Sequence, residues 1–150
     1  FLHAGAPYLI PLAGRSLMFE DFLAREVDAG RIAPDAFTDA ARNVRVHVHC
    51  HQKALSYTDA VVRVLGLPRN YRVSEIKSGC CGMAGAFGYQ KDHYAVSMKV
   101  AEQVLLPAVR AAGAEDIIAA SGTSCRHQIA DGAGRRARHT AEVLWEALKR

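Results

Sequence analysis

The chain has 150 residues, of which 50% are hydrophobic and 23% are charged, and its formal net charge is +4. This length and composition fit one globular domain, and they exclude two independent cores or a chain that is disordered throughout. No apolar run approaches the ~18 residues that a membrane-spanning helix needs, and the basic residues near the C-terminus lack the interleaved aromatic residues of nucleic-acid-binding proteins.

The first part of the chain is predicted to contribute helices that pack on one face of a sheet. Residues 1–15 are interpreted as the remnant of an upstream region, because the chain opens without an initiator methionine, and residues 16–150 as the domain. The segment 7–12 is a weak candidate for an edge strand, since it holds two prolines. Ser16 is expected to cap a helix that runs to about Asp28, and Pro34 to open a short helix through Arg42.

Three short segments are predicted to be strands because they are apolar or alternate between apolar and polar residues. They cover residues 44–48, 71–76 and 116–120. Helices are expected over residues 54–65 and 91–112, with a short helix from Cys125 and a last helix capped by Thr140. This alternation of strands and helices predicts an α/β fold with a small parallel sheet of three to four strands, flanked by helices.

The four cysteines of the chain each follow one of the predicted strands. Cys50 comes after the first, Cys80 and Cys81 after the second, and Cys125 after the third. Because the carboxyl ends of parallel strands open on one edge, we expect the cysteine loops to meet there. The competing interpretation is that small buried thiols lie in these loops by chance. Adjacent cysteines do not suit a disulfide framework, so we expect a reducing compartment, the cytoplasm.

A glycine-rich loop surrounds the cysteine pair. Gly79, Gly82 and Gly85 recur at every third position, and the loop leads into a predicted helix. Glycine allows backbone N–H groups to approach an anion closely, and a helix N-terminus favours negative charge. A thiolate-ligated metal cluster is such an anion. A phosphate is the alternative, although the loop lacks the spacing of a nucleotide-binding motif, and a plain flexible loop is the simplest interpretation.

Histidines stand beside the single cysteines. His49 and His51 flank Cys50, and His127 lies two residues after Cys125. His51 and His127 are candidates for nitrogen ligands or for hydrogen bonds and positive charge around thiolates, and solvated loop histidines are the alternative. His47 alternates with the valines of the first strand, and we assign it no role beyond the strand.

Three motifs carry a resemblance to a known family. Residues 49–55 (HCHQKAL), 78–85 (SGCCGMAG) and 122–128 (GTSCRHQ) resemble the cysteine-rich CCG domain. That domain occurs in one of the subunits of heterodisulfide reductase and in iron–sulfur subunits of glycolate oxidase, lactate utilisation complexes and anaerobic glycerol-3-phosphate dehydrogenase. The likeness is greatest to the C-terminal region of bacterial proteins that fuse an FAD-linked oxidase to an iron–sulfur region, the D-lactate dehydrogenase type.

The resemblance implies electron transfer within a flavin-linked oxidoreductase. An upstream FAD domain or subunit would oxidise a 2-hydroxy acid such as lactate or glycolate, and electrons would pass through this and another iron–sulfur region toward a quinone or other acceptor. Cys50, Cys80, Cys81 and Cys125 would be the metal ligands, with a 4Fe-4S cluster as the expected cofactor. The chain by itself is not expected to oxidise the hydroxy acid. Its place would be cytoplasmic or peripheral at the inner membrane through partners.

One position departs from the family pattern. The fuller heterodisulfide reductase motif ends in C-x-x-C, whereas Gln128 stands here at the last position. Four cysteines still suffice for one cubane cluster. They suit a structural zinc site equally well, with a histidine in place of one cysteine as a variant. A metal-free thiol protein, with a reactive Cys50 or a Cys80–Cys81 disulfide, is the third hypothesis.

Overall fold

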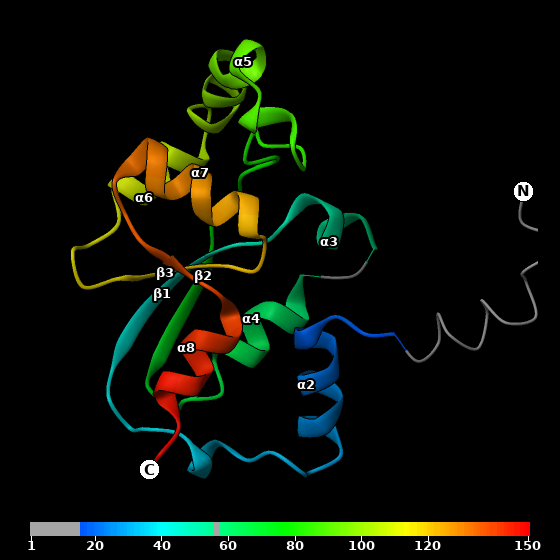
Figure 1. Ribbon diagram of the computed structural model, residues 1–150. Helices are drawn as coiled ribbons and strands as arrows, with labels where there is room; N and C mark the ends of the chain where they lie inside the picture. The colour runs from blue at the N-terminus through cyan, green and yellow to red at the C-terminus, as the bar shows by residue number, and fades with distance from the viewer. Residues whose placement is uncertain (1–15, 56–57) are drawn as a thin grey trace, which may run out of the picture.

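The computed structural model describes residues 16–55 and 58–150, and this part of the chain forms an α/β fold around a four-stranded sheet (Figure 1). The strands are β1 (Arg42–His47), β2 (Tyr71–Glu75), β3 (Ile117–Ala120) and β4 (Ala137–Arg138). All neighbours are parallel, in the order β2-β1-β3-β4. The predicted fold class is therefore confirmed, with β4 as a strand that the sequence pattern did not indicate.

Helices cover both faces of this sheet (Figure 1). They are α2 (Phe19–Asp28), α3 (Cys50–Leu55), α4 (Asp59–Leu65), α5 (Lys91–Ala101), α6 (Leu105–Arg110), α7 (Thr123–Ala133) and α8 (Thr140–Ala147), with 3-10 turns η1 (Pro34–Ala36) and η2 (Phe87–Tyr89). One core cluster joins β1 to α2, α4 and α8, and a second joins β3 to α6 and α7. No helix in the described residues is long and apolar enough to cross a bilayer.

The alternation of β1 decides which side chains reach which core. Val44 and Val46 are fully buried in the cluster with α2, α4 and α8. Successive side chains of a strand point to opposite faces, so His47 faces the side on which α6 and α7 pack. His47 pairs with Ala120 as the last residues of β1 and β3, and Ala120 belongs to the second cluster. His47 therefore lies at the carboxyl edge, on the face that carries Cys81 and Cys125.

The predicted helix from Pro34 to Arg42 is wrong. Only the turn η1 is helical there, and Arg42 already belongs to β1, where it pairs with Tyr71. Phe37 explains the difference, because its buried ring and its bridge to Leu148 hold the backbone extended after the turn. The suggested edge strand over residues 7–12 lies outside the described residues.

Two other predicted helices are each divided in two. The segment 54–65 is covered by the end of α3 and by α4, and residues 56–57 between them lie outside the described part. The segment 91–112 contains α5 and α6, with a break at Val104, whose φ of −144° is not helical. The break turns the chain so that Leu105 and Val109 enter the second core cluster. Pro107 lies in the first turn of α6, where a missing N–H costs nothing.

Candidate metal centre

Two buried cysteines form the innermost part of the centre. Cys81 follows β2 and Cys125 lies in the first turn of α7, and their sulfur atoms are 3.3 Å apart. The Cys125 thiol donates a hydrogen bond to the Cys81 sulfur, and this bond lowers the pKa of Cys81 although burial opposes the effect. The same bond, together with burial, raises the pKa of Cys125. The pair thus favours one thiolate, which is the form that binds metals.

His47 lies beside these sulfurs. Its side chain is fully buried, and its Nδ1 is 2.7 Å from Oγ of Ser78. A ring nitrogen of His47 and the sulfurs of Cys81 and Cys125 all lie within 4.8 Å of one another. The Nε2 atom has no hydrogen-bond partner within the described part of the chain. This histidine was not among the predicted ligands, although a signal was present: a polar side chain at the end of a strand whose neighbours are buried valines.

Cys50 and Cys80 interact with each other but lie outside the group of ligand atoms formed by His47, Cys81 and Cys125. Both are partly exposed, with Cys50 as the first residue of α3 and Cys80 in the loop after β2. Burial, followed by the charge and hydrogen bond of Cys80, raises the pKa of Cys50. Negative charge on Cys50 and on Cys80 also raises the pKa of Cys125. The structure thus confirms that the cysteine loops meet at the carboxyl ends of the strands, and all four cysteines are free thiols.

The three predicted glycines differ in their surroundings. Gly82 has a φ of +91°, and a Cβ there would come within 2.1 Å of the Ser97 carbonyl oxygen, so only glycine fits. Its N–H donates to the Cys80 sulfur at 3.3 Å, as expected for a loop that stabilises thiolates. Gly85 also has a positive φ, of +70°, but Gly79 and Gly85 both face open space.

The structure places the two histidines predicted as cofactor neighbours at the surface. His51 is exposed, and its backbone N–H donates to Nδ1 of His49 at 3.1 Å. His127 lies on α7, where its Nδ1 is 2.6 Å from the hydroxyl of the exposed Tyr89. Neither belongs to the group of ligand atoms around Cys81. A role for them beside the metal stays a prediction.

Gln128 occupies the position at which the heterodisulfide reductase motif that the sequence resembles has a further cysteine. Its side chain is buried one helical turn after Cys125, and its Nε2 donates to the carbonyl and hydroxyl oxygens of Ser97, at 3.2 and 2.9 Å. The amide group therefore joins α7 to α5. Its contacts are those of a structural residue, and they explain why a polar side chain is tolerated inside the core.

With this geometry established, comparisons with known proteins identify a distant relative. A subunit of the anaerobic glycerol-3-phosphate dehydrogenase of Escherichia coli K12 is 26% identical over 127 residues, which is 85% of this chain and 31% of that protein. The same protein of Escherichia coli O157:H7 matches to the same extent. The chain is similar to an oxidoreductase subunit. It spans about a third of that relative's length. No family model matches the chain, and no solved structure matches it.

The similarity supports a related cysteine-rich domain, and the donor atoms support a metal site. Cysteine sulfurs and a histidine nitrogen within 4.8 Å of one another are suited to zinc or to iron–sulfur centres. Lys53 holds the chain just before the cysteine pair, since its Nζ donates to the Ser78 carbonyl at 2.8 Å and pairs with Glu75 at 3.1 Å. Lys53 was not singled out from the sequence, although it follows Cys50 by three residues on the same short helix.

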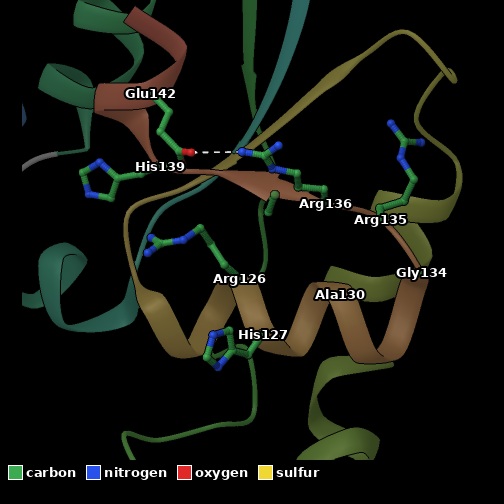
Figure 2. A pocket seen from close by; sticks show the side chains of 9 residues that line it. Arg126, His127, Ala130, Gly134, Arg135, Arg136, His139 and Glu142 are labelled. Atoms are coloured by element: carbon green, nitrogen blue, oxygen red, sulfur yellow. Dashed lines mark hydrogen bonds and ion pairs between the residues drawn. The ribbon is translucent and has the colours of Figure 1, made fainter. Parts of the chain in front are cut away.

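A second feature lies on the outer side of α7, where a hollow is lined by basic residues. Figure 2 shows Arg126 in the space between α7 and the start of α8, and Glu142 reaching across to Arg136. The Arg126 guanidinium donates to the carbonyls of Ala120 and Ser121, at 3.0 and 2.7 Å. Arg136 pairs with Glu142 at 3.2 Å. These arginines join the end of β3 to α7 and α8, so the hollow owes its charge to groups that already hold the fold together.

Proposed function

We propose that this chain is an iron–sulfur electron-transfer domain of a flavin-linked oxidoreductase. The observation that carries the proposal is the contact between the sulfurs of Cys81 and Cys125, on which the charges of Cys50 and Cys80 also act. Four thiolates are the ligands that iron–sulfur clusters require. The similarity to a dehydrogenase subunit supports the redox assignment.

The donor atoms are of the kind that such a group takes, and the sulfurs of Cys81 and Cys125, now 3.3 Å apart, would separate to bind two different irons. Cys81 and Cys125 would hold it from inside the core, and Cys50 and Cys80 from the rim, with a 4Fe-4S cluster as the proposed form. When bound, the cluster accepts and releases single electrons. The protein supplies the Gly82 N–H as a hydrogen-bond donor to the Cys80 sulfur, which stabilises negative charge there.

The wider complex is inferred from the resemblance and from the relative. An upstream domain or subunit with FAD would oxidise an alcohol carbon, and a 2-hydroxy acid of the lactate or glycolate type is the proposed substrate. The name of the relative makes glycerol 3-phosphate the competing substrate. Another iron–sulfur region and a quinone would complete the electron path. We place the complex in the cytoplasm or at the inner surface of the membrane.

A structural zinc site is the second candidate function. The support for zinc is the short distance between the ligand atoms of Cys81, Cys125 and His47. The two sulfurs are 3.3 Å apart, which is close to the separation of two sulfur ligands on one tetrahedral ion. Zinc would hold the three loops together without redox chemistry, and the thiol ligands would be the same.

Metal analysis of the full chain, purified without oxygen, separates the two. Iron and acid-labile sulfide in near-equal amounts, with a broad visible absorption that bleaches on reduction, are expected for the electron-transfer domain. Colourless protein with one zinc would overturn that assignment and establish the structural site. Adding iron and sulfide to metal-free protein is the control, since a cluster lost during purification then re-forms.

A further inference from the structure

The ligand set of the centre extends beyond the cysteines. His47 is fully buried, yet its Nε2 atom has no hydrogen-bond partner in the described part of the chain. Buried polar atoms are nearly always paired, so an unpaired one needs an explanation. A ring nitrogen of His47 is close to the sulfurs of Cys81 and Cys125, all three atoms lying within 4.8 Å of one another. The histidine therefore stands beside a group of atoms that binds metals.

The other ring nitrogen of His47 has an oxygen partner that suits a metal-binding imidazole. Nδ1 is 2.7 Å from Oγ of Ser78, and this hydroxyl also lies 3.4 Å from the carbonyl oxygen of Ile76. A carbonyl only accepts, so the hydroxyl donates to Ile76 and accepts the Nδ1–H of His47. In this arrangement the proton is on Nδ1, and Nε2 offers a lone pair to a metal. Histidines that bind metals show this arrangement, with the remote N–H held by an oxygen acceptor.

The distances within the group fit ligands of a single metal atom. On a tetrahedral ion with bonds of about 2.3 Å to sulfur, two sulfur ligands are separated by about 3.8 Å. The observed separation of 3.3 Å between Cys81 and Cys125 is close to this value and needs only a small adjustment. His47 comes from β1, Cys81 from the loop after β2 and Cys125 from α7, so three elements of the fold supply one set of ligands.

We propose that Nε2 of His47 is a metal ligand, and that it shares one metal atom with Cys81 and Cys125. The proposal rests on the metal centre of the proposed function in its zinc form, because each iron of a 4Fe-4S cubane is bound by three sulfides and takes one protein ligand. Gln128 is not needed as a ligand in this arrangement, because its amide is bound to Ser97.

The test uses cadmium-113 as a probe, because it binds the same ligands and reports each of them by nuclear magnetic resonance. The reduced, metal-free full chain, labelled with nitrogen-15 at histidine, receives one equivalent of the ion without oxygen. We expect one cadmium resonance, split by a one-bond coupling to Nε2 of His47. His47→Ala should remove the splitting and weaken cadmium binding about 100-fold or more. His47→Cys should retain the metal and move the resonance toward that of an added sulfur ligand.

His93 provides the matched control. Its Nδ1 is also buried without a partner in the described residues, but its ring stacks on Phe87 and is not part of the group around Cys81. His93→Ala should leave the cadmium spectrum unchanged. Bound cadmium with no coupling to His47 would overturn the proposal, and so would a failure of the chain to bind cadmium. Iron and sulfide are measured in a separate experiment. Their absence would overturn the electron-transfer function, whereas a cadmium–nitrogen coupling to His47 would still establish this histidine as a metal ligand.

Discussion

The two sides of α7 show two different uses of polar side chains. On the inner side, the ring of His47 and the thiols of Cys81 and Cys125 are buried, and Nε2 of the ring has no partner within the described residues. On the outer side, Arg126 and Arg136 are held by carbonyl oxygens and by Glu142. The charged groups of the outer hollow already have partners, whereas the unpaired nitrogen of His47 lies beside the sulfurs of Cys81 and Cys125. Unsatisfied polar atoms in the core thus indicate a ligand more directly than an open basic surface does.

The largest effect is expected from removing an inner sulfur. Cys81→Ser and Cys125→Ser should each abolish metal binding, because the two thiolates approach one metal atom from different elements of the fold. Metal content of the purified variants, with circular dichroism to verify folding, measures this. If both variants kept their full metal content, Cys81 and Cys125 would not be ligands, and the inner side of α7 would not differ from the outer side in binding a metal.

Gly82 is the next position at which the centre can be disturbed. Gly82→Ala should lower the free energy of unfolding by about 3 kcal/mol, since a side chain there meets a backbone oxygen and the φ of +91° is strained for alanine. Gly79→Ala is the matched control in the same loop, where a Cβ meets open space, and it should change stability by less than ~0.5 kcal/mol. If chemical denaturation showed equal losses of unfolding free energy in Gly82→Ala and Gly79→Ala, Gly82 would not be packed against the Ser97 carbonyl as described.

A substitution at Gln128 tests whether this buried amide is a structural group or a metal ligand. Gln128→Ala should cost about 1–2 kcal/mol of stability, because it removes two hydrogen bonds to Ser97, and it should leave the metal in place. A double-mutant cycle with Ser97→Ala should show that the two losses are not additive. Loss of metal in Gln128→Ala would place the amide among the ligands instead.

The smallest effect is expected on the outer side, at Glu142. The backbone N–H of His139 and then the guanidinium of Arg136 lower the pKa of this carboxyl below its ordinary value, against the opposing effect of burial. A carboxyl with a lowered pKa stabilises the fold fully at pH values above its unfolded-state pKa of about 4.3. This stabilisation is lost as the pH falls from there through the pKa of the folded state. The exposed setting limits the contribution to under ~1 kcal/mol.

Denaturation of Glu142→Gln and of the unaltered protein at pH 7 and pH 3 measures that contribution. The variant should be less stable at pH 7, and the difference between the two proteins should shrink at pH 3. An unchanged difference would mean that the carboxyl acts through the shape of its helix cap and not through its charge. Arg136→Ala is the companion variant, because it removes one cause of the lowered pKa and leaves the bond from His139 in place.

Much of the fold could be predicted because the relevant signals are local. Alternation along residues 44–48 and the apolar run over residues 116–120 identify strands, and the cysteines directly follow them. Other features depend on distant partners. The two residues of β4 form a strand only because they pair with Ile118 and Ala119 of β3. The chain after Pro34 is extended because Phe37 is anchored against the C-terminus.

The sequence by itself determined that four thiols follow three strand–loop junctions, and hence that a parallel sheet gathers them at one edge. The tertiary structure decided which donors share the inner position. His47 is an ordinary strand residue in the sequence, and its alternation with the valines shows only that it points away from them. Whether the opposite face meets solvent or sulfur depends on how α7 and the loop after β2 pack over the end of β1. That packing places His47 beside Cys81 and Cys125, while His51 and His127, nearer to cysteines in sequence, stay outside this group.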